Sequence, residues 1–87
     1  MSSNPYIVSV QFTDPDTWKR LSSTSLVLAA TATPWPQNST FVEARIDGGA
    51  AESLPPGVAW PLDGVDLSRI EVRGVVGDGI TVAGHSR

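Results

Sequence analysis

Proline and glycine interrupt this chain so often that long helices are excluded. The 87 residues contain seven prolines and eight glycines, and the stretches between them rarely exceed a dozen residues. Those stretches are rich in Val, Ile, Thr and Ser, which favour pleated strands. Six to eight short strands at even spacing predict an all-β fold with negligible helix, either a small antiparallel β-sandwich or a jelly-roll-like barrel.

Three segments show the alternation of a half-buried strand. Residues 6–12, 41–46 and 69–74 each place apolar side chains at every second position. In 41–46, for example, Val42, Ala44 and Ile46 should share the core face. Residues 50–54 and 58–62 are expected to form shorter extended pieces.

Other segments are less regular, and their assignments leave alternatives open. Residues 25–32 form a small, apolar run that predicts a strand covered on both faces, with a helix as the alternative. Residues 17–21 fit a short strand or one helical turn, and we favour the strand. Asp47-Gly48-Gly49 predicts a reverse turn, and Gly77-Asp78-Gly79 predicts a tight hairpin before a last strand.

Size and composition bound what the domain can do. One β domain should span residues 1–87, with an extended N-terminal arm over about residues 1–5. The absence of cysteine excludes disulfides and thiolate zinc sites, so a small core is expected to gain stability from self-association or docking. The net charge of −3 and scattered basic residues argue against nucleic acid. No apolar run is long enough to span a bilayer and no signal peptide is evident, so we expect a soluble protein made in a cytoplasm.

Catalytic and metal-binding chemistry is poorly represented. The single histidine, His85, is close to the C-terminal end, which is a poor place for a precisely held general base. Asp14 and Asp16 have a spacing that could serve calcium, but the rest of a calcium loop is missing, so turn capping is preferred. Asp63 and Asp66 invite the same two interpretations. The sequence therefore predicts no enzyme, no cofactor and no metal.

The tryptophans suggest a docking surface. Trp18 and Trp60 can be core residues, whereas Trp35 stands between Pro34 and Pro36 in a polar stretch. Two flanking prolines predict a rigid, protruding loop, and rigid aromatic loops suit protein docking. They also suit stacking on sugar rings, which keeps a carbohydrate- or receptor-binding module as the alternative.

A second candidate segment is the N-terminal arm. Asn4, Pro5 and Tyr6, with the residues before them, could pair with an adjacent sheet edge. The predicted partner-binding residues are therefore Asn4, Pro5 and Tyr6 together with Pro34, Trp35 and Pro36.

Charged residues of alternating sign occupy the outward positions of two predicted strands. These residues are Glu43, Arg45, Arg69, Glu71 and Arg73. A solvated sheet face with cross-strand pairs is the preferred interpretation, and a polar rim of an interface is the alternative.

The C-terminal third resembles a pattern found in small tailed-phage virion proteins. The matching features are a turn at Pro56-Gly57, then Asp66-Leu67-Ser68, an Ile70-x-Val72 strand and a closing Gly77-Asp78-Gly79 turn. The chain departs from that pattern at Val58, commonly polar there, and at Glu71, often aromatic.

The resemblance implies a compact β-sandwich located in a virion. Such a subunit would decorate or cement a capsid by bridging neighbouring copies of the major capsid protein or other virion subunits. The resemblance also implies that the subunit forms a homo-oligomer such as a trimer. A tail or fibre accessory subunit is a further alternative with the same fold.

Overall fold

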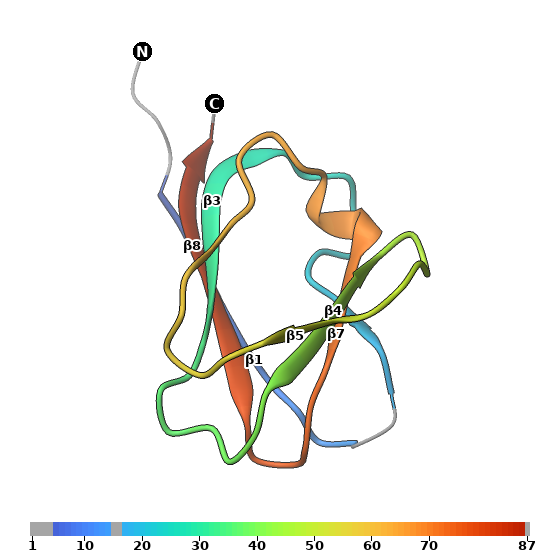
Figure 1. The fold of residues 1–87 in the computed structure, drawn as a ribbon. Helices are drawn as coiled ribbons and strands as arrows, with labels where there is room; N and C mark the ends of the chain where they lie inside the picture. The colour runs from blue at the N-terminus through green and yellow to red at the C-terminus, as the bar shows by residue number, and fades with distance from the viewer. Residues whose placement is uncertain (1–4, 15–16, 87) are drawn as a thin grey trace.

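The computed structural model describes residues 5–14 and 17–86. The described residues form eight strands and one short 3₁₀ turn, Leu67–Arg69 (Figure 1). The strands are β1 (Pro5–Gln11), β2 (Lys19–Arg20), β3 (Leu28–Pro34), β4 (Val42–Ile46), β5 (Glu52–Leu54), β6 (Trp60–Pro61), β7 (Ile70–Arg73) and β8 (Gly79–Ser86).

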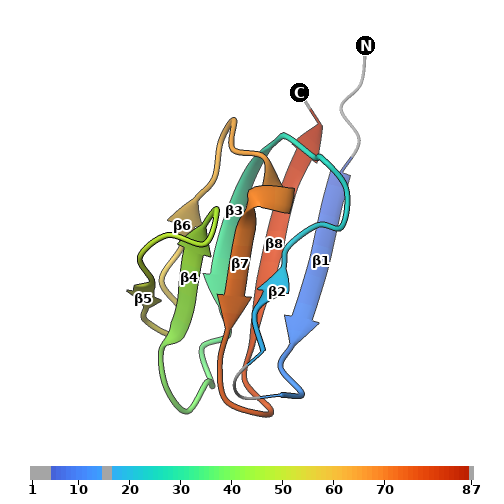
Figure 2. The ribbon, with the colours of Figure 1, turned by 90° about the vertical axis from the view of Figure 1, so that its right-hand side faces the viewer.

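The strands form two facing antiparallel sheets (Figures 1 and 2). Sheet A has the order β1-β8-β3-β6, and sheet B has the order β2-β7-β4-β5. The expected all-β sandwich is confirmed. The two sheets remain open, so the fold is a sandwich rather than a closed barrel.

The strand order is that of a jelly roll, which can be described as one long antiparallel hairpin folded into two sheets. β1 pairs with β8, β2 with β7, β3 with β6 and β4 with β5, all antiparallel. A ribbon of four such pairs, rolled so that successive pairs alternate between the sheets, gives the eight-stranded jelly roll. The additional pairs β3·β8 and β4·β7 complete the two sheets.

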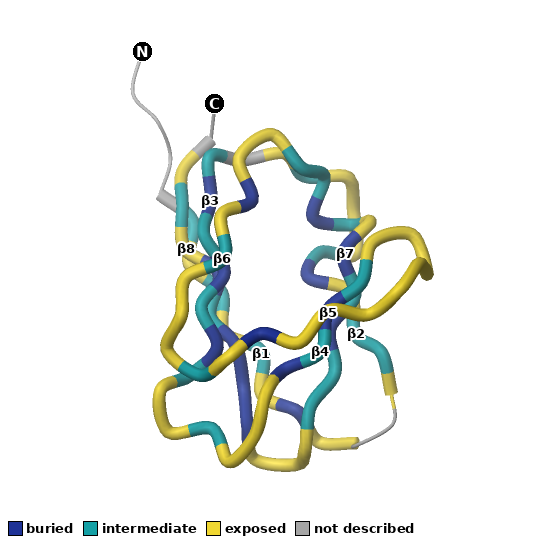
Figure 3. Tube along the Cα trace, viewed as in Figure 1, coloured by how far each residue is buried: buried dark blue, intermediate teal, exposed yellow. Residues whose placement is uncertain are grey.

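The core lies between the sheets and is built by alternation along each strand (Figure 3). Ile70 and Val72 in β7 are fully buried, as are Ile80 and Val82 in β8. The largest buried side chains are Phe12, Leu62, Leu67, Ile70, Ile80, Val42, Val72, Val82 and Pro34. Burying apolar area of this kind is the main stabilising term of the fold.

Most of the strand predictions are confirmed. The segments 6–12, 17–21, 41–46, 50–54 and 58–62 each contain an observed strand, although the strands are shorter. Val42 and Ala44 are buried as expected. Ile46 is 41% exposed, and the pairing of β4 with β5 ends two residues before it, at Ala44.

The prediction of a strand within residues 25–32, rather than a helix, is confirmed, but the expectation that both of its faces are covered is wrong. The strand runs from Leu28 to Pro34, and Ala30, Ala32 and Pro34 are buried while Thr31 and Thr33 are only half-buried. Small residues made the run look uniformly apolar, although only one face meets the core.

Pro34 is accommodated inside β3 by its position in the ladder. Leu62 N–H donates to Ala30 C=O, so the even-numbered residues of β3 direct their backbone groups toward β6. β6 has two residues and ends short of Pro34, so the missing N–H of proline removes no ladder hydrogen bond there.

The predicted hairpin at Gly77-Asp78-Gly79 is also wrong. The segment turns the chain, but it connects β7 in sheet B to β8 in sheet A, and these strands do not pair. Phe12 explains the crossing, because its N–H donates to Asp78 C=O and its C=O accepts from Gly77 N–H. The turn is thereby attached to the end of β1.

The reverse turn predicted at Asp47-Gly48-Gly49 is confirmed. Asp47 and Gly48, both with positive φ, form a hairpin turn between β4 and β5.

Candidate functional site

Charge is divided sharply between the two sheets. None of the strands of sheet A contains Asp, Glu, Lys or Arg. Every strand of sheet B contains at least one of them. The two outer faces of the sandwich therefore offer different chemistry to a partner.

The outer face of sheet A is small, neutral and rich in hydroxyl groups. Because Ile80 and Val82 point into the core, Thr81 and Ala83 point outward. The register places Ser9 beside Thr81 and Ile7 beside Ala83. The hydroxyls of Ser9 and Thr81 are 3.0 Å apart, and the Ile7 residue is 75% exposed.

Trp35 lies against the same sheet. Its backbone N–H donates to Gly79 C=O at 3.0 Å, and its indole Nε1–H donates to the Thr81 hydroxyl at 2.9 Å. The ring occupies the space that a side chain at position 79 would fill, since a Cβ there would lie 2.7 Å from the indole carbons. Glycine at position 79 is what lets the ring pack on β8.

The expectation that Trp35 protrudes is therefore wrong. The residue is half-buried, Pro34 is fully buried at the end of β3, and of the three only Pro36 is exposed. The hydrogen bond to Thr81 and the open space above Gly79 draw the indole onto the sheet. Proline on both sides restricts the backbone but leaves the direction of the side chain to its contacts.

The loop after Trp35 is fixed to the β7–β8 turn by side-chain hydrogen bonds. The Asn38 amide donates to Gly79 C=O at 2.8 Å and accepts from Gly79 N–H at 2.9 Å. The carboxylate of Asp78, which is only 6% exposed, accepts from the backbone N–H groups of Ser39 and Thr40 and from the Ser39 hydroxyl. We call this set of contacts, made by Asn38, Ser39, Thr40, Asp78 and Gly79, the loop clamp.

The predicted N-terminal segment is only partly described. Asn4 lies outside the described residues. Pro5 and Tyr6 are the first residues of β1, in register with His85 and Gly84. Tyr6 is half-buried and packs against the core.

The two predicted segments lie on one sheet but do not form one site. Tyr6 is opposite Gly84, whereas Trp35 packs on Gly79, which pairs with Gln11 at the other end of β1. Sheet A is therefore the element that joins the two parts of the predicted surface.

The outer face of sheet B is a ladder of paired charges around Trp18. Glu43 binds Arg73 at 2.9 Å, and Arg45 binds Glu71 at 3.0 Å. Both arginines place their guanidinium carbon over the Trp18 ring, 4.1 Å away for Arg45 and 4.6 Å for Arg73. The interpretation as a face with cross-strand pairs is confirmed for these four residues.

The sequence did not reveal the role of Trp18. A core position was the alternative weighed for it, whereas the ring lies on the outer face as a cation–π partner of two arginines. Trp18 lies two residues before Arg20, and side chains two positions apart in a strand point to the same face. Because Arg20 points outward from β2, the same direction could have been inferred for Trp18.

Two shallow hollows open on sheet B. One, of about 320 Å³, is lined by Thr40, Phe41, Glu43, Ser53, Arg73, Gly74 and Val75. The other, of about 240 Å³, is lined by Arg20, Asp47, Gly48, Ser68, Arg69 and Glu71. Their polar groups largely pair with each other: Glu43 with Arg73, and Asp47 with Arg69.

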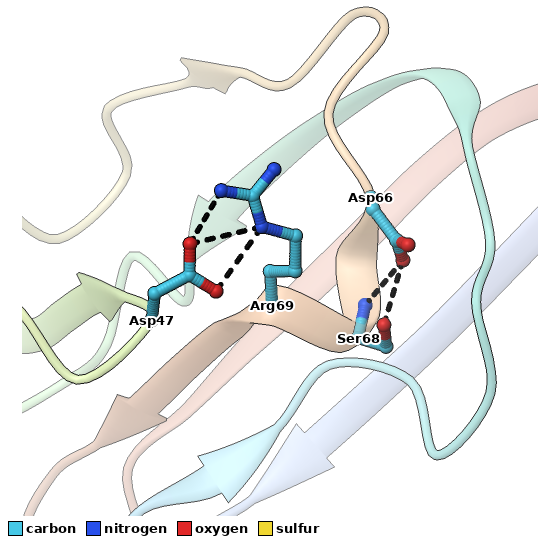
Figure 4. Close-up of polar contacts among 4 residues, drawn as sticks. All are labelled: Asp47, Asp66, Ser68 and Arg69. Carbon is cyan, nitrogen blue, oxygen red and sulfur yellow. Dashed lines mark hydrogen bonds and ion pairs between the residues drawn. The ribbon is translucent and has the colours of Figure 1, made fainter.

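Two aspartates near the second hollow have lowered pKa values, and Figure 4 shows their contacts with Arg69 and Ser68. Hydrogen bonds from Arg69 lower the pKa of Asp47, with the positive charge of Arg69 adding to the effect. Hydrogen bonds from the Ser25 hydroxyl, then from Leu26 N–H and Ser68, hold the pKa of Asp66 far below its ordinary value. Asp66 thus caps the 3₁₀ turn and ties it to the segment before β3.

His85 is exposed on the outer face of sheet A, opposite Pro5 of β1 and Ala29 of β3. Over residues 5–14 and 17–86, no three His, Asp or Glu side chains gather closely enough to bind a metal ion. Within the same residues, every buried side-chain nitrogen or oxygen has a hydrogen-bond partner.

The fold and the surfaces define a small jelly-roll sandwich with one neutral and one charge-paired face. Comparison with protein-family models, with curated proteins and with solved structures gave no match. Among the described residues, no helix has the length and apolar character needed to cross a membrane.

Proposed function

We propose that this chain is a non-enzymatic structural subunit of a virion, a capsid decoration or cement protein that docks through the outer face of sheet A. The observation that carries the proposal is the neutral outer face on a jelly-roll sheet. Jelly rolls are common in viral capsid and lectin domains, so the strand order supports a role of this class by analogy of fold. The phage-like pattern of the C-terminal third gives the proposal its viral context.

The physical argument concerns the cost of removing each face from water. Charged groups are expensive to desolvate unless they are paired, and interface cores are depleted of charge. Sheet A offers Ile7, Ala83 and small hydroxyl side chains, which a protein surface can cover at little desolvation cost. Sheet B would remain in water with its ion pairs intact.

The proposed mechanism is mechanical. A subunit lying across the boundary between two capsid proteins would add contact area that resists separation of the shell. The partners would be the major capsid protein or other virion subunits, encountered after synthesis in the host cytoplasm.

The test compares two preparations of virus particles, one that contains this chain and one that lacks it. Mass spectrometry should detect the chain in the particles, and particles lacking it should release their genome at a lower temperature. Adding back the purified chain should restore the release temperature. The variant Ala83→Arg, which places a charge on the outer face of β8, should fail to restore it. Ser53→Arg, an exposed change on sheet B, is the matched control and should succeed.

Two results would refute the proposal. One is the absence of the chain from particles, and the other is full restoration by Ala83→Arg. Immunogold labelling of the particles distinguishes the related assignment to a tail or fibre, because the label would then avoid the capsid shell.

Carbohydrate or receptor binding is the second candidate, and the setting of Trp35 favours it. The indole lies on sheet A next to Thr81, whose hydroxyl also meets that of Ser9. An aromatic ring beside hydroxyl groups can stack on a sugar and share hydrogen bonds with it. A glycan array probed with the wild-type chain and with Trp35→Ala would support this candidate if binding occurs and is lost in the variant.

A further inference from the structure

The four sheet edges of this sandwich are protected unequally. Sheet B ends in β2, which is two charged residues long, and in β5, which has three residues including Glu52 and is followed by Pro55. Sheet A ends on one side in β6, which has two residues including Pro61. Short length, charge and proline are the usual devices that stop edge strands from pairing with other chains.

The fourth edge, β1, has none of these devices after its first residue. It is seven residues long, it carries no charge, and its register with β8 runs without a bulge from Pro5 to Gln11. Figure 2 shows β1 as the outermost strand of its sheet. Ile7, in the middle of this edge, is 75% exposed.

The backbone groups that face outward from β1 follow from the hydrogen bonds of Phe12. Both its N–H and its C=O are bonded to the turn that leads into β8. Because the direction alternates along an antiparallel strand, Ile7, Ser9 and Gln11 direct their N–H and C=O groups to the open side.

We propose that β1 pairs antiparallel with β1 of a second copy of this chain, about a two-fold axis at Ser9. Ser9 then faces Ser9 of the second copy, and Ile7 faces Gln11 of the second copy in both directions. All three are positions whose backbone groups face the open edge, so each pair exchanges both of its hydrogen bonds. The two A sheets join into one continuous sheet.

A second copy suits this edge better than an unrelated strand for two reasons. The arrangement is self-complementary, because the same three residues supply donors and acceptors on both sides of the axis. The paired edge also carries no charge, so two chains with a net charge of −3 each can meet there without placing like charges opposite each other. The inference does not depend on a virion role, since it rests only on the edge of the sheet.

The experiment measures the mass of the full-length chain in solution by analytical ultracentrifugation over a range of concentrations. Wild type should show a reversible monomer–dimer equilibrium. Ser9→Pro removes an outward N–H without removing a bond to β8, and it should raise the dissociation constant of the dimer by roughly tenfold or more. Ser9→Ala is its control, because it loses the hydroxyl contact to Thr81 but keeps the N–H, and should remain dimeric.

A charge exchange tests the position of the axis. Ser9→Lys and Ser9→Glu should each be monomeric, because like charges would face each other across the axis. An equimolar mixture of the two variants should form a heterodimer whose stability falls with added salt. Ser53→Lys on sheet B should behave as wild type. Circular dichroism and thermal unfolding establish that each variant is folded.

Three outcomes would overturn the proposal. The first is a wild-type chain that stays monomeric at several hundred micromolar, and the second is a dimer unaffected by both Ser9→Pro and Ser9→Lys. The third is a failure of the lysine and glutamate variants to associate when mixed. None of these outcomes bears on whether the chain is found in particles, so the two proposals can fail separately.

Discussion

Replacement of Asp78 by alanine should loosen the loop clamp and lower the stability of the whole domain. The Asp78 carboxylate is nearly buried and accepts from Ser39 N–H at 2.9 Å and from Thr40 N–H at 3.2 Å. The Ser39 hydroxyl donates to it as well. Alanine leaves these donors without their acceptor, while the backbone bond from Phe12 N–H to the C=O of residue 78 is retained.

The magnitude follows from these contacts. A hydrogen bond to a charged group contributes about 1.5–3 kcal/mol to stability, so the two backbone donors alone set a ceiling of about 3–6 kcal/mol. Ser39 and Thr40 are exposed, so water can replace part of what is lost. We expect Asp78→Ala to lower the free energy of unfolding by about 2–3 kcal/mol, and hence the Tm by about 10–20 °C for a domain of this size.

Urea unfolding followed by circular dichroism measures this loss. Asp78→Asn keeps one acceptor oxygen and should lie between wild type and alanine. Asp63→Ala, an exposed aspartate, controls for the removal of one negative charge. If Asp78→Ala unfolds within about 0.5 kcal/mol of Asp63→Ala, the clamp contributes nothing and the reasoning is refuted.

Three further changes test other parts of the structure. Gly79→Ala should displace the Trp35 ring and destabilise the fold by about 1–3 kcal/mol in urea unfolding; a loss below about 0.5 kcal/mol would contradict the packing described. Because the pKa of Asp66 lies below its ordinary 3.8, its carboxylate stabilises the fold above that pH, and this contribution is lost as the pH falls further. Asp66→Asn should therefore give a shallower loss of stability in acid than Asp63→Asn, as measured by urea unfolding at several pH values. Trp18→Ala should cost about 1–2 kcal/mol in urea unfolding through the lost cation–π contacts, and the loss should be smaller in high salt.

The sequence predicted the features that depend on neighbouring residues. Alternation along 6–12, 41–46 and 69–74 located three strands and their buried faces, since a side chain's direction in a strand is set by its position alone. The turn at Asp47-Gly48 was also predictable, because both of its central residues have positive φ, which favours Asp and Gly.

What the sequence did not predict depends on contacts between distant segments. Gly77-Asp78-Gly79 has the composition of a hairpin turn, but Phe12, which is far away along the chain, binds it and directs β8 into the other sheet. Trp35 has the flanking prolines of a protruding loop, but the space above Gly79 accommodates its ring. In both cases the deciding residue is more than 40 positions away, beyond the reach of a local pattern.

Pairing through the β1 edge and docking through the outer face of sheet A would strengthen each other in an assembly. If two copies pair through β1, their neutral faces lie side by side on one continuous sheet. Binding of one face to a repeating surface then places the second face near the next repeat, so the second contact forms at a high effective concentration. A face made of small side chains, each contributing little, can in this way give a stable attachment. The same coupling predicts that Ser9→Pro, which weakens the dimer without adding a charge to the outer face, also weakens attachment to a particle, whereas Ala83→Arg weakens attachment without dissociating the dimer.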